Sequence, residues 1–273
     1  ITGRTILEIG EKGVTLLDRH GRRSLLETDS VVIALGTRPV ETLAEKAGVI
    51  NLSLAGSIML SAMAGFAVAY ASGSVLLGFL AAALVSMAVA LLIAFASIRL
   101  RLNQIAVGFV LTLLCTDLSS FLGDPYVGQR MSGVPRLAIP GLEQIPWLGP
   151  ILFKQNLSVY GSFLAIAAAY FFIFRTRRGL ELQGVGERPE AAHARGIRVN
   201  LWRYVYTVLG GLLVGIAGAA YSLDVRLGWR EGLTTNYGWI ALAIVIFGGW
   251  HPVRAASGAY LFGALSIAAL KLQ

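Results

Sequence analysis

Long apolar blocks fill the chain from residue 52 to residue 270, and they restrict what it can fold into. Most blocks have roughly 17–25 residues, the length that an α-helix needs to cross a bilayer. A backbone in lipid must satisfy its own N–H and C=O groups, which a helix does. We therefore predict an all-α integral membrane protein with about seven transmembrane helices, at residues 52–71, 75–98, 105–122, 157–174, 204–223, 237–250 and 255–270. The last two are short, so each is a candidate for a tilted, broken or re-entrant segment.

The composition agrees with a membrane protein. Apolar residues make up 56% of the chain and charged residues 14%, and the mean hydropathy is +0.69. Soluble domains have about 45–50% and about 25% respectively. The net charge of +8 does not indicate nucleic-acid binding, because residues 1–50 are neutral and the surplus lies between apolar blocks. The single Cys115 lies inside an apolar block, which excludes a disulfide framework and a cysteine metal cluster.

Residues 1–50 are predicted to form a small β-rich extension, distinct from the membrane domain of residues 51–273. Turn residues separate four short strands, at Arg4–Ile9, Val14–Asp18, Arg23–Thr28 and Ser30–Leu35. The run DSVVIALGTRP, from Asp29 to Pro39, resembles the tail of the NADH-binding domain in flavin-dependent pyridine-nucleotide oxidoreductases. No G-x-G-x-x-G follows a strand here, so the turn that binds a pyrophosphate is absent. We therefore expect a structural remnant that binds no cofactor.

The longest polar insert between apolar blocks, residues 175–203, carries seven arginines and three glutamates. A short sequence in its middle has the start and stop signals of a helix. Pro189 suits the first turn, where its missing N–H costs nothing. An acid near the positive end, two good helix formers and a left-handed stop then follow, as Glu190, Ala191, Ala192 and Gly196. We predict a helix of one to two turns at the membrane surface.

The placement of arginine and lysine predicts the orientation of the chain. If the insert 175–203 is cytoplasmic, ten basic residues between spans lie on that side and five lie on the other. This is the bias of the positive-inside rule. It places the loop 123–156 outside and residue 50 in the cytoplasm.

The insert and its flanks resemble a family of transport proteins. Glu190-Ala191-Ala192, with Gly196 after three further residues, matches the EAA…G loop of ABC-importer permeases. RTRRGL before it and GIRV after it resemble the branched-chain-type permease family, in its simple-sugar and nucleoside branch. Three other stretches fit the same branch, namely Asn51–Gly56, Ile240–Ala243 running into Phe247–Pro252, and Leu261–Gly263.

This resemblance implies a permease subunit of an importer in the bacterial inner membrane, carrying a nucleoside or a simple sugar. Such importers have two permease subunits, two ATPase subunits and an external solute-binding protein. The chain has no G-x-x-x-x-G-K-[ST] loop, so it cannot hold ATP phosphates itself. The resemblance implies instead that residues 189–195 lie in a groove of the ATPase. We expect no nucleic-acid partner, no cofactor and no metal.

The chain also departs from the family pattern. Ala55 and Ser57 stand where the branch often has Glu and Gln. Arg188 replaces a small residue or Asn before the proline, and Asn236-Tyr237-Gly238 stands where Gly-Arg-Gly is common. Family members have at least one span before residue 51 and more chain after Gln273. We therefore expect a permease truncated at both ends, with a foreign N-terminal segment from a gene fusion or misassembly.

Asp117 is the one acid inside a predicted span, and Thr112 and Thr116 give the same block a polar side. A carboxylate in lipid is costly, so it usually faces the bundle interior or water. Two interpretations stay open, a lining of the solute pathway or a hydrated position near the outer surface. His193 and His251 have no partner at metal-ligand spacing, and we expect both to be solvated.

Two other functions are alternatives to the importer. A secondary transporter or channel would need no ATPase, but such proteins tend to pair ionisable groups at mid-membrane, and Asp117 stands alone. A remnant of a flavin- or NADH-dependent oxidoreductase would rest on residues 1–48 only.

Overall fold

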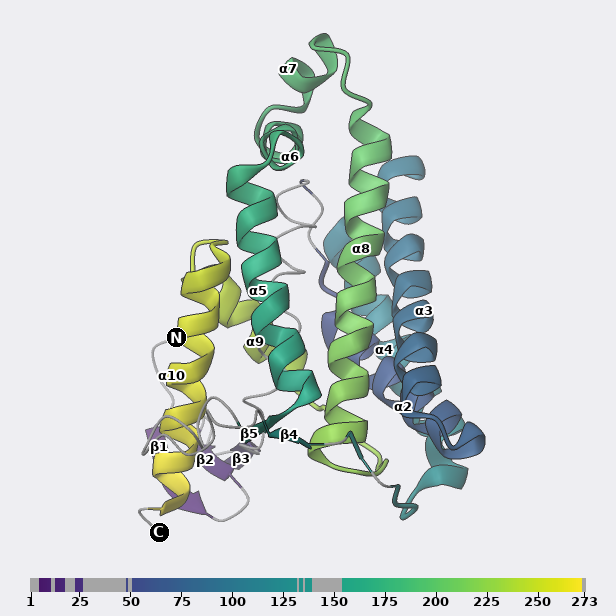
Figure 1. The fold of residues 1–273 in the computed structure, drawn as a ribbon, viewed down its shortest axis with the longest axis vertical. Helices are drawn as coiled ribbons and strands as arrows, with labels where there is room; N and C mark the ends of the chain where they lie inside the picture. Colours follow the sequence, from purple (N-terminus) through teal and green to yellow (C-terminus); the bar gives the residue numbers. More distant parts are fainter. Residues whose placement is uncertain are drawn as a thin grey trace.

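The computed structural model describes residues 5–10, 13–17, 23–26, 48, 51–131, 133–134, 136–138 and 154–271. Most of its elements are helices (Figure 1). Near the N-terminus, three strands form an antiparallel sheet in the order β1 (Thr5–Gly10), β2 (Gly13–Leu17) and β3 (Arg23–Leu26). The strand predicted at residues 30–35 lies outside the described residues.

Five of the described helices are long and apolar enough to cross a membrane, and they lie where the first five spans were predicted. They are α2 (Leu54–Ser72), α3 (Val75–Ala94) continued by η1 (Phe95–Arg99), α4 (Gln104–Gly123) continued by η2 (Asp124–Tyr126), α5 (Leu157–Arg175) and α8 (Val199–Ala220) continued by η4 (Tyr221–Val225). The chain is therefore a mostly helical, multi-pass membrane protein.

The prediction of seven spans is not confirmed. Helix α9 (Tyr237–Phe247) has 11 residues, which extend about 16 Å, roughly half of a bilayer core. Asn236 precedes it with a left-handed φ of 69°, and Trp250 follows it with a φ of 58°, so the backbone turns at both ends. Helix α10 (Pro252–Lys271) has 20 residues but does not belong to the five apolar spans.

Helix α2 is at the centre of the bundle and packs against α3, α4 and α8. Figure 1 shows α3 and α8 running side by side. Close approach of these helices depends on glycine. A Cβ at Gly215 would lie 2.6 Å from the Cα of Ala83, and one at Gly218 would lie 2.8 Å from the carbonyl oxygen of Ile58. Small residues thus let these helix backbones touch, which stabilises association in lipid through van der Waals packing.

The two ends of the bundle carry different elements. Helices α6 (Arg177–Glu187) and α7 (Pro189–Ala194) cover one end, between α5 and α8 (Figure 1). At the other end, β4 (Arg136–Ala138) pairs with β5 (Lys154–Asn156) just before α5. We call these the α6–α7 end and the β4–β5 end.

Candidate functional site

Helix α6 is fixed firmly to the end of α5. The Oγ1 of Thr176 accepts a hydrogen bond from the N–H of Gly179 at 3.0 Å and so caps α6. The Nε2 of Gln183 donates to the carbonyl oxygen of Ile173 at 2.9 Å. Gly179 approaches the α5 backbone so closely that a Cβ there would lie 2.5 Å from the same carbonyl oxygen. Two apolar side chains of α6, Leu182 and Val185, are fully buried. A force on α6 is therefore passed directly to α5.

Helix α7 begins and ends where the local sequence predicts. Pro189 occupies its first turn and Glu190 is the acid there. Glu190 and Ala191 are exposed, whereas Ala192 is buried, with 5% of its surface accessible. The face of α7 that carries Ala192 therefore packs against the protein, and the opposite face is available to a partner.

Gly196 ends α7 in a Schellman motif. Its φ is +84°, and its N–H donates to the carbonyl oxygen of His193 at 2.8 Å. The next N–H, that of Ile197, reaches back to the carbonyl oxygen of Ala192 at 3.1 Å. These are the two hydrogen bonds that define this helix end. No atom lies within 4 Å of a Cβ placed at Gly196, so the conformation rather than space demands glycine here.

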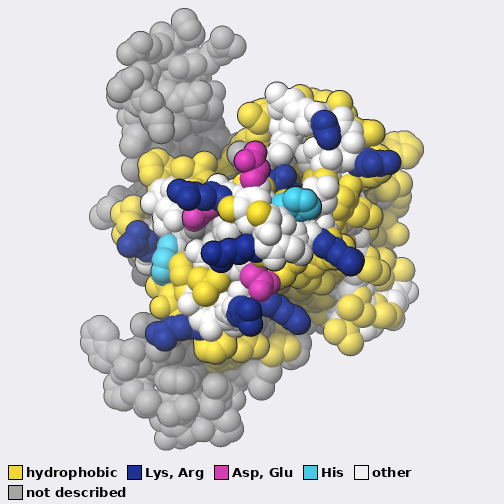
Figure 2. All heavy atoms as spheres, turned by 90° about the horizontal axis from the view of Figure 1, so that it is seen from above, with side chains coloured by type: hydrophobic (Ala, Val, Ile, Leu, Met, Phe, Trp, Pro, Cys, Tyr) yellow, Lys and Arg dark blue, Asp and Glu magenta, His cyan; other side chains and the backbone are white. Residues whose placement is uncertain are grey.

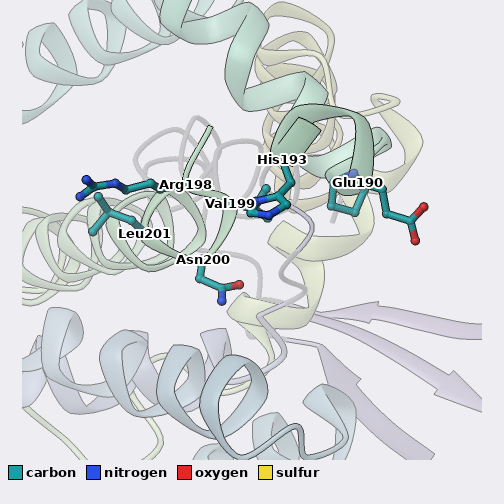
Figure 3. Close-up of a pocket in the computed structure, with 7 residues that line it drawn as sticks. Glu190, His193, Arg198, Val199, Asn200 and Leu201 are labelled. Carbon is teal, nitrogen blue, oxygen red and sulfur yellow. The ribbon is translucent and has the colours of Figure 1, made fainter. Parts of the chain in front are cut away.

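Two cavities flank α7. One, of about 680 Å³, lies toward the start of α8 and is lined by Pro189, Glu190, His193, Arg198, Val199, Asn200 and Leu201. Figure 3 shows Glu190 directed away from the α8 residues, with His193 between them. The other, of about 610 Å³, lies on the α6 side and includes Leu180, Gly184, Ala191 and Ile197. Because a cavity lies on each side of α7, this helix projects from the surface.

The surface at the α6–α7 end is strongly basic. Figure 2 looks down on this end and shows lysine and arginine side chains spread over it, with fewer acids between them. Arg177 and Glu181 approach to 3.9 Å as an exposed i,i+4 pair, a type that contributes little stability. A partner that binds here would be favoured by acidic groups of its own.

Comparison with known proteins identifies the family. The family model described as the permease component of the branched-chain amino acid transport system matches residues 29–272. The chain belongs to this family. The match begins inside the segment 1–50, before the first described span.

Named relatives indicate which branch of the family the chain belongs to. The guanosine ABC transporter permease NupQ of Bacillus subtilis is 33% identical over 80% of this chain and 72% of its own length. The nucleoside permease NupC of Lactococcus lactis is 33% identical over 80% and 73%. TsgC13 of Haloferax volcanii, provisionally named a glucose ABC transporter permease, is 38% identical over 85% and 72%. The chain is thus an ABC-importer permease of the sugar and nucleoside branch, and such permeases are not enzymes.

A solved structure supports the fold. It is an inward-facing conformation of an ABC transporter provisionally assigned to the metal-chelate type, with a TM-score of 0.50 and 17% identity. The similarity covers 89% of this chain and 77% of the other. At this identity it shows a shared fold and nothing about the solute.

The three predicted pathway residues, Thr112, Thr116 and Asp117, all lie on α4. The Oγ1 of Thr112 donates to the carbonyl oxygen of Leu52 at 3.0 Å, and that of Thr116 donates to the carbonyl oxygen of Thr112 at 2.8 Å. Asp117 is exposed on the outer side of α4. The hydroxyls of both threonines thus donate to backbone carbonyl oxygens, whereas the carboxylate of Asp117 lies at the surface of α4.

The expectation for the two histidines is half right. His193 is exposed. His251, in contrast, stacks on Phe174 with ring centroids 5.0 Å apart and also contacts the ring of Tyr170 at 5.8 Å. His251 is half-buried, because the turn between α9 and α10 places it beside the end of α5, so the expectation of a solvated side chain holds for it only in part. In the part of the permease that the structure describes, no three His, Cys, Asp or Glu side chains gather as metal ligands.

Sequence reasoning missed the residues that position α7. Val199, Asn200 and Leu201 line the larger cavity from the first turn of α8, and Gln183 ties α6 to α5. The cap at Thr176 could have been found, because a Thr before a helix is a common start signal. The role of Gln183 carries no such local signal, because its partner lies ten residues away on another helix.

Proposed function

We propose that this chain is the membrane-spanning subunit of an ATP-driven importer for a nucleoside or a simple sugar. The names of its relatives mention guanosine, nucleosides or glucose. This supports the proposed solute class. The importer would contain a second permease subunit, two ATPase subunits and an external solute-binding protein, in a bacterial inner membrane.

One observation carries the proposal most directly. A short helix, α7, is closed at its end by Gly196 and stands between two cavities at a basic end of the membrane bundle. Helix α7 would bind in a groove of the ATPase, through an element formed by Pro189, Glu190, Ala191, Ala192 and Gly196. Nucleotide-driven closure would move α7, and the tight α6–α5 contact would pass the motion to the spans as rigid-body rocking.

Arginine placement supports the orientation. The described basic residues between spans gather at the α6–α7 end, which would face the cytoplasm under the positive-inside rule. A Cβ at Gly48 would lie 3.4 Å from Nη2 of Arg203 and 3.5 Å from the Cα of Gly186. Residue 48, shortly before the first span, therefore lies at this same end, which supports a cytoplasmic position for residue 50. The β4–β5 end would face outward.

The α4 face adds support for a path between subunits. Asp117 is exposed on α4, among exposed apolar side chains of a helix long enough to cross a membrane. Because a carboxylate facing hydrocarbon is costly, this side of α4 would adjoin water or a second permease subunit. Thr112 and Thr116 would then stiffen the α4 wall beside the path rather than contact the solute.

The test is reconstitution of the full-length permease with its ATPase and binding protein in proteoliposomes. We expect ATP hydrolysis that rises when a nucleoside or sugar is supplied with the binding protein, and accumulation of that solute. Uptake that proceeds without ATP, driven by an ion gradient, would contradict the proposal and favour a secondary transporter.

A further inference from the structure

The loop of residues 226–236 enters the membrane bundle from the β4–β5 end. At its start, Trp229 is buried against Gly123, at the end of α4. Further on, the Oγ1 of Thr234 donates to the Sδ of Met59 at 3.4 Å. Met59 lies 13 residues before Ser72, the end of α2, so it is roughly 20 Å from that end of the helix. The loop therefore reaches well into a hydrocarbon core of about 30 Å.

Polar side chains of this loop are exposed, including those next to Thr234, which lies at membrane depth. Arg230, Glu231, Thr235 and Asn236 are all exposed. Asn236 also has a left-handed φ of 69°, directly before α9. Non-helical backbone at this depth is tolerated only where it is buried in protein or lines a water-filled cavity. The rest of this chain does not bury these groups, so within the chain the second condition fits them.

Helix α4 contacts the segment that contains this loop at two places, and polar side chains lie on α4 between them. The rings of Phe109 and Trp239 stack 5.4 Å apart near one end of this contact, and Trp229 packs on Gly123 at the other. Thr116 and Ser120 lie between these two contacts at helical spacing, on the same stripe of α4. Asp117 is next to that stripe. Two polar surfaces thus run parallel from the β4–β5 end inward.

A cavity of about 290 Å³ lies within the loop, lined by Arg230, Glu231, Thr235, Asn236 and Tyr237 among others. Its volume is close to the lower limit of small-molecule sites. The Tyr237 ring is held in place from behind. The hydroxyl of Tyr221 donates to that of Tyr237 at 3.2 Å, and the Nε of Arg226 donates to the hydroxyl of Tyr221 at 3.2 Å.

The lining chemistry suits one class of solute. A sugar or ribose presents several neutral hydroxyls, each both donor and acceptor, on a ring with apolar faces. Here Arg230 supplies donors, Glu231 supplies acceptors, and Thr235 and Asn236 supply both. Tyr237 adds an aromatic ring. The opposite charges of Arg230 and Glu231 cancel, so the cavity has no net charge to favour an ionised solute.

We infer that the loop 226–236 and the Thr116–Ser120 stripe of α4 line a water-filled vestibule open at the β4–β5 end, and that the cavity at Arg230–Tyr237 binds a neutral polyhydroxylated ring. This inference rests on the importer function and names where the solute first meets the membrane subunit. An amino-acid zwitterion would also match the opposite charges of Arg230 and Glu231, and the test distinguishes it from a polyhydroxylated ring.

The test uses thiol accessibility in the full-length permease with Cys115→Ala. Single cysteines replace Thr235, in the cavity, and Ser120, a near-isosteric change on α4. Leu91→Cys, on the apolar helix α3 and 49% exposed, is the matched control. A charged, impermeant thiosulfonate is added outside intact cells. We expect both vestibule cysteines to react at least tenfold faster than Leu91→Cys, and guanosine or glucose to slow the Thr235→Cys reaction several-fold.

Reaction rates equal to that of Leu91→Cys would overturn the vestibule. Rapid reaction that neither guanosine nor glucose slows, or that leucine slows instead, would overturn the binding site for a polyhydroxylated ring. Labelling needs no ATPase, so its outcome is separate from that of the proteoliposome assay. Protected labelling in a permease that imports without ATP would refute the proposed importer and retain the site.

Discussion

The N–H of Ile197 donates to the carbonyl oxygen of Ala192 at 3.1 Å, across a left-handed glycine. This hydrogen bond connects the residue that follows the end of α7 to the residue on the buried face of the helix. It explains why a six-residue helix, too short to be stable alone in water, keeps a defined shape on the membrane surface. The first predictions follow from this contact.

Gly196→Val should weaken binding of the ATPase about tenfold. A side chain in the left-handed conformation costs roughly 1–2 kcal/mol, and a β-branched one is among the least tolerated there. Pull-down of the ATPase by the full-length permease measures the effect. Gly184→Ala is the control, because Gly184 is helical and has open space around it. Equal recovery of ATPase with both variants would show that α7 is only a connector.

Ala192→Glu should abolish ATPase co-purification while membrane insertion stays normal. Ala192 is buried, so a carboxylate there would be desolvated without a partner. Ala192→Ser provides the matched control, because it adds no charge at the same buried position and a small hydroxyl can hydrogen-bond to the backbone of its own helix. The prediction fails if the two variants retain the same amount of ATPase.

Gln183→Ala should reduce coupling measurably. Losing its hydrogen bond to Ile173 costs about 1 kcal/mol and loosens α6 from α5. We expect ATP hydrolysis to continue with a lower ratio of solute imported to ATP hydrolysed. Gln183→Glu restores an acceptor but not the donor, so it should behave like Gln183→Ala. An unchanged ratio would contradict the role given to this contact.

The orientation predicts different labelling of the two ends on intact cells. In a Cys115→Ala background, a cysteine replacing Val127, which is 49% exposed near the β4–β5 end, should react with an impermeant maleimide. A cysteine replacing Ala194 on α7 should react only after the cells are opened. The reverse pattern would refute the orientation.

The N-terminal segment should bind neither flavin nor NADH, because it has no phosphate-binding turn. We expect purified full-length protein to show no flavin absorbance near 450 nm and no saturable change on titration with either cofactor. A stoichiometric flavin spectrum would restore the oxidoreductase alternative.

The sequence by itself determined the first five spans and both ends of α7. Apolar length decides whether a helix can cross lipid, and Pro189 and Gly196 act on their own backbone, so neither needs a distant partner. It also identified the family through residues that lie close together in the chain. These are local properties, and local properties can be read from sequence.

Only the tertiary structure decided how the remaining segments lie. The length of α9 depends on left-handed backbone at Asn236 and Trp250. Because neither residue is glycine, the two residues themselves give no strong local signal for this conformation. The insertion of the loop 226–236 depends on contacts with α2 and α4, more than a hundred residues earlier. The hydroxyl of Thr112 donates to the carbonyl oxygen of Leu52, sixty residues earlier, a contact that the local sequence does not indicate. Contacts between distant segments choose among conformations that the local sequence permits equally, and so they alone place the vestibule.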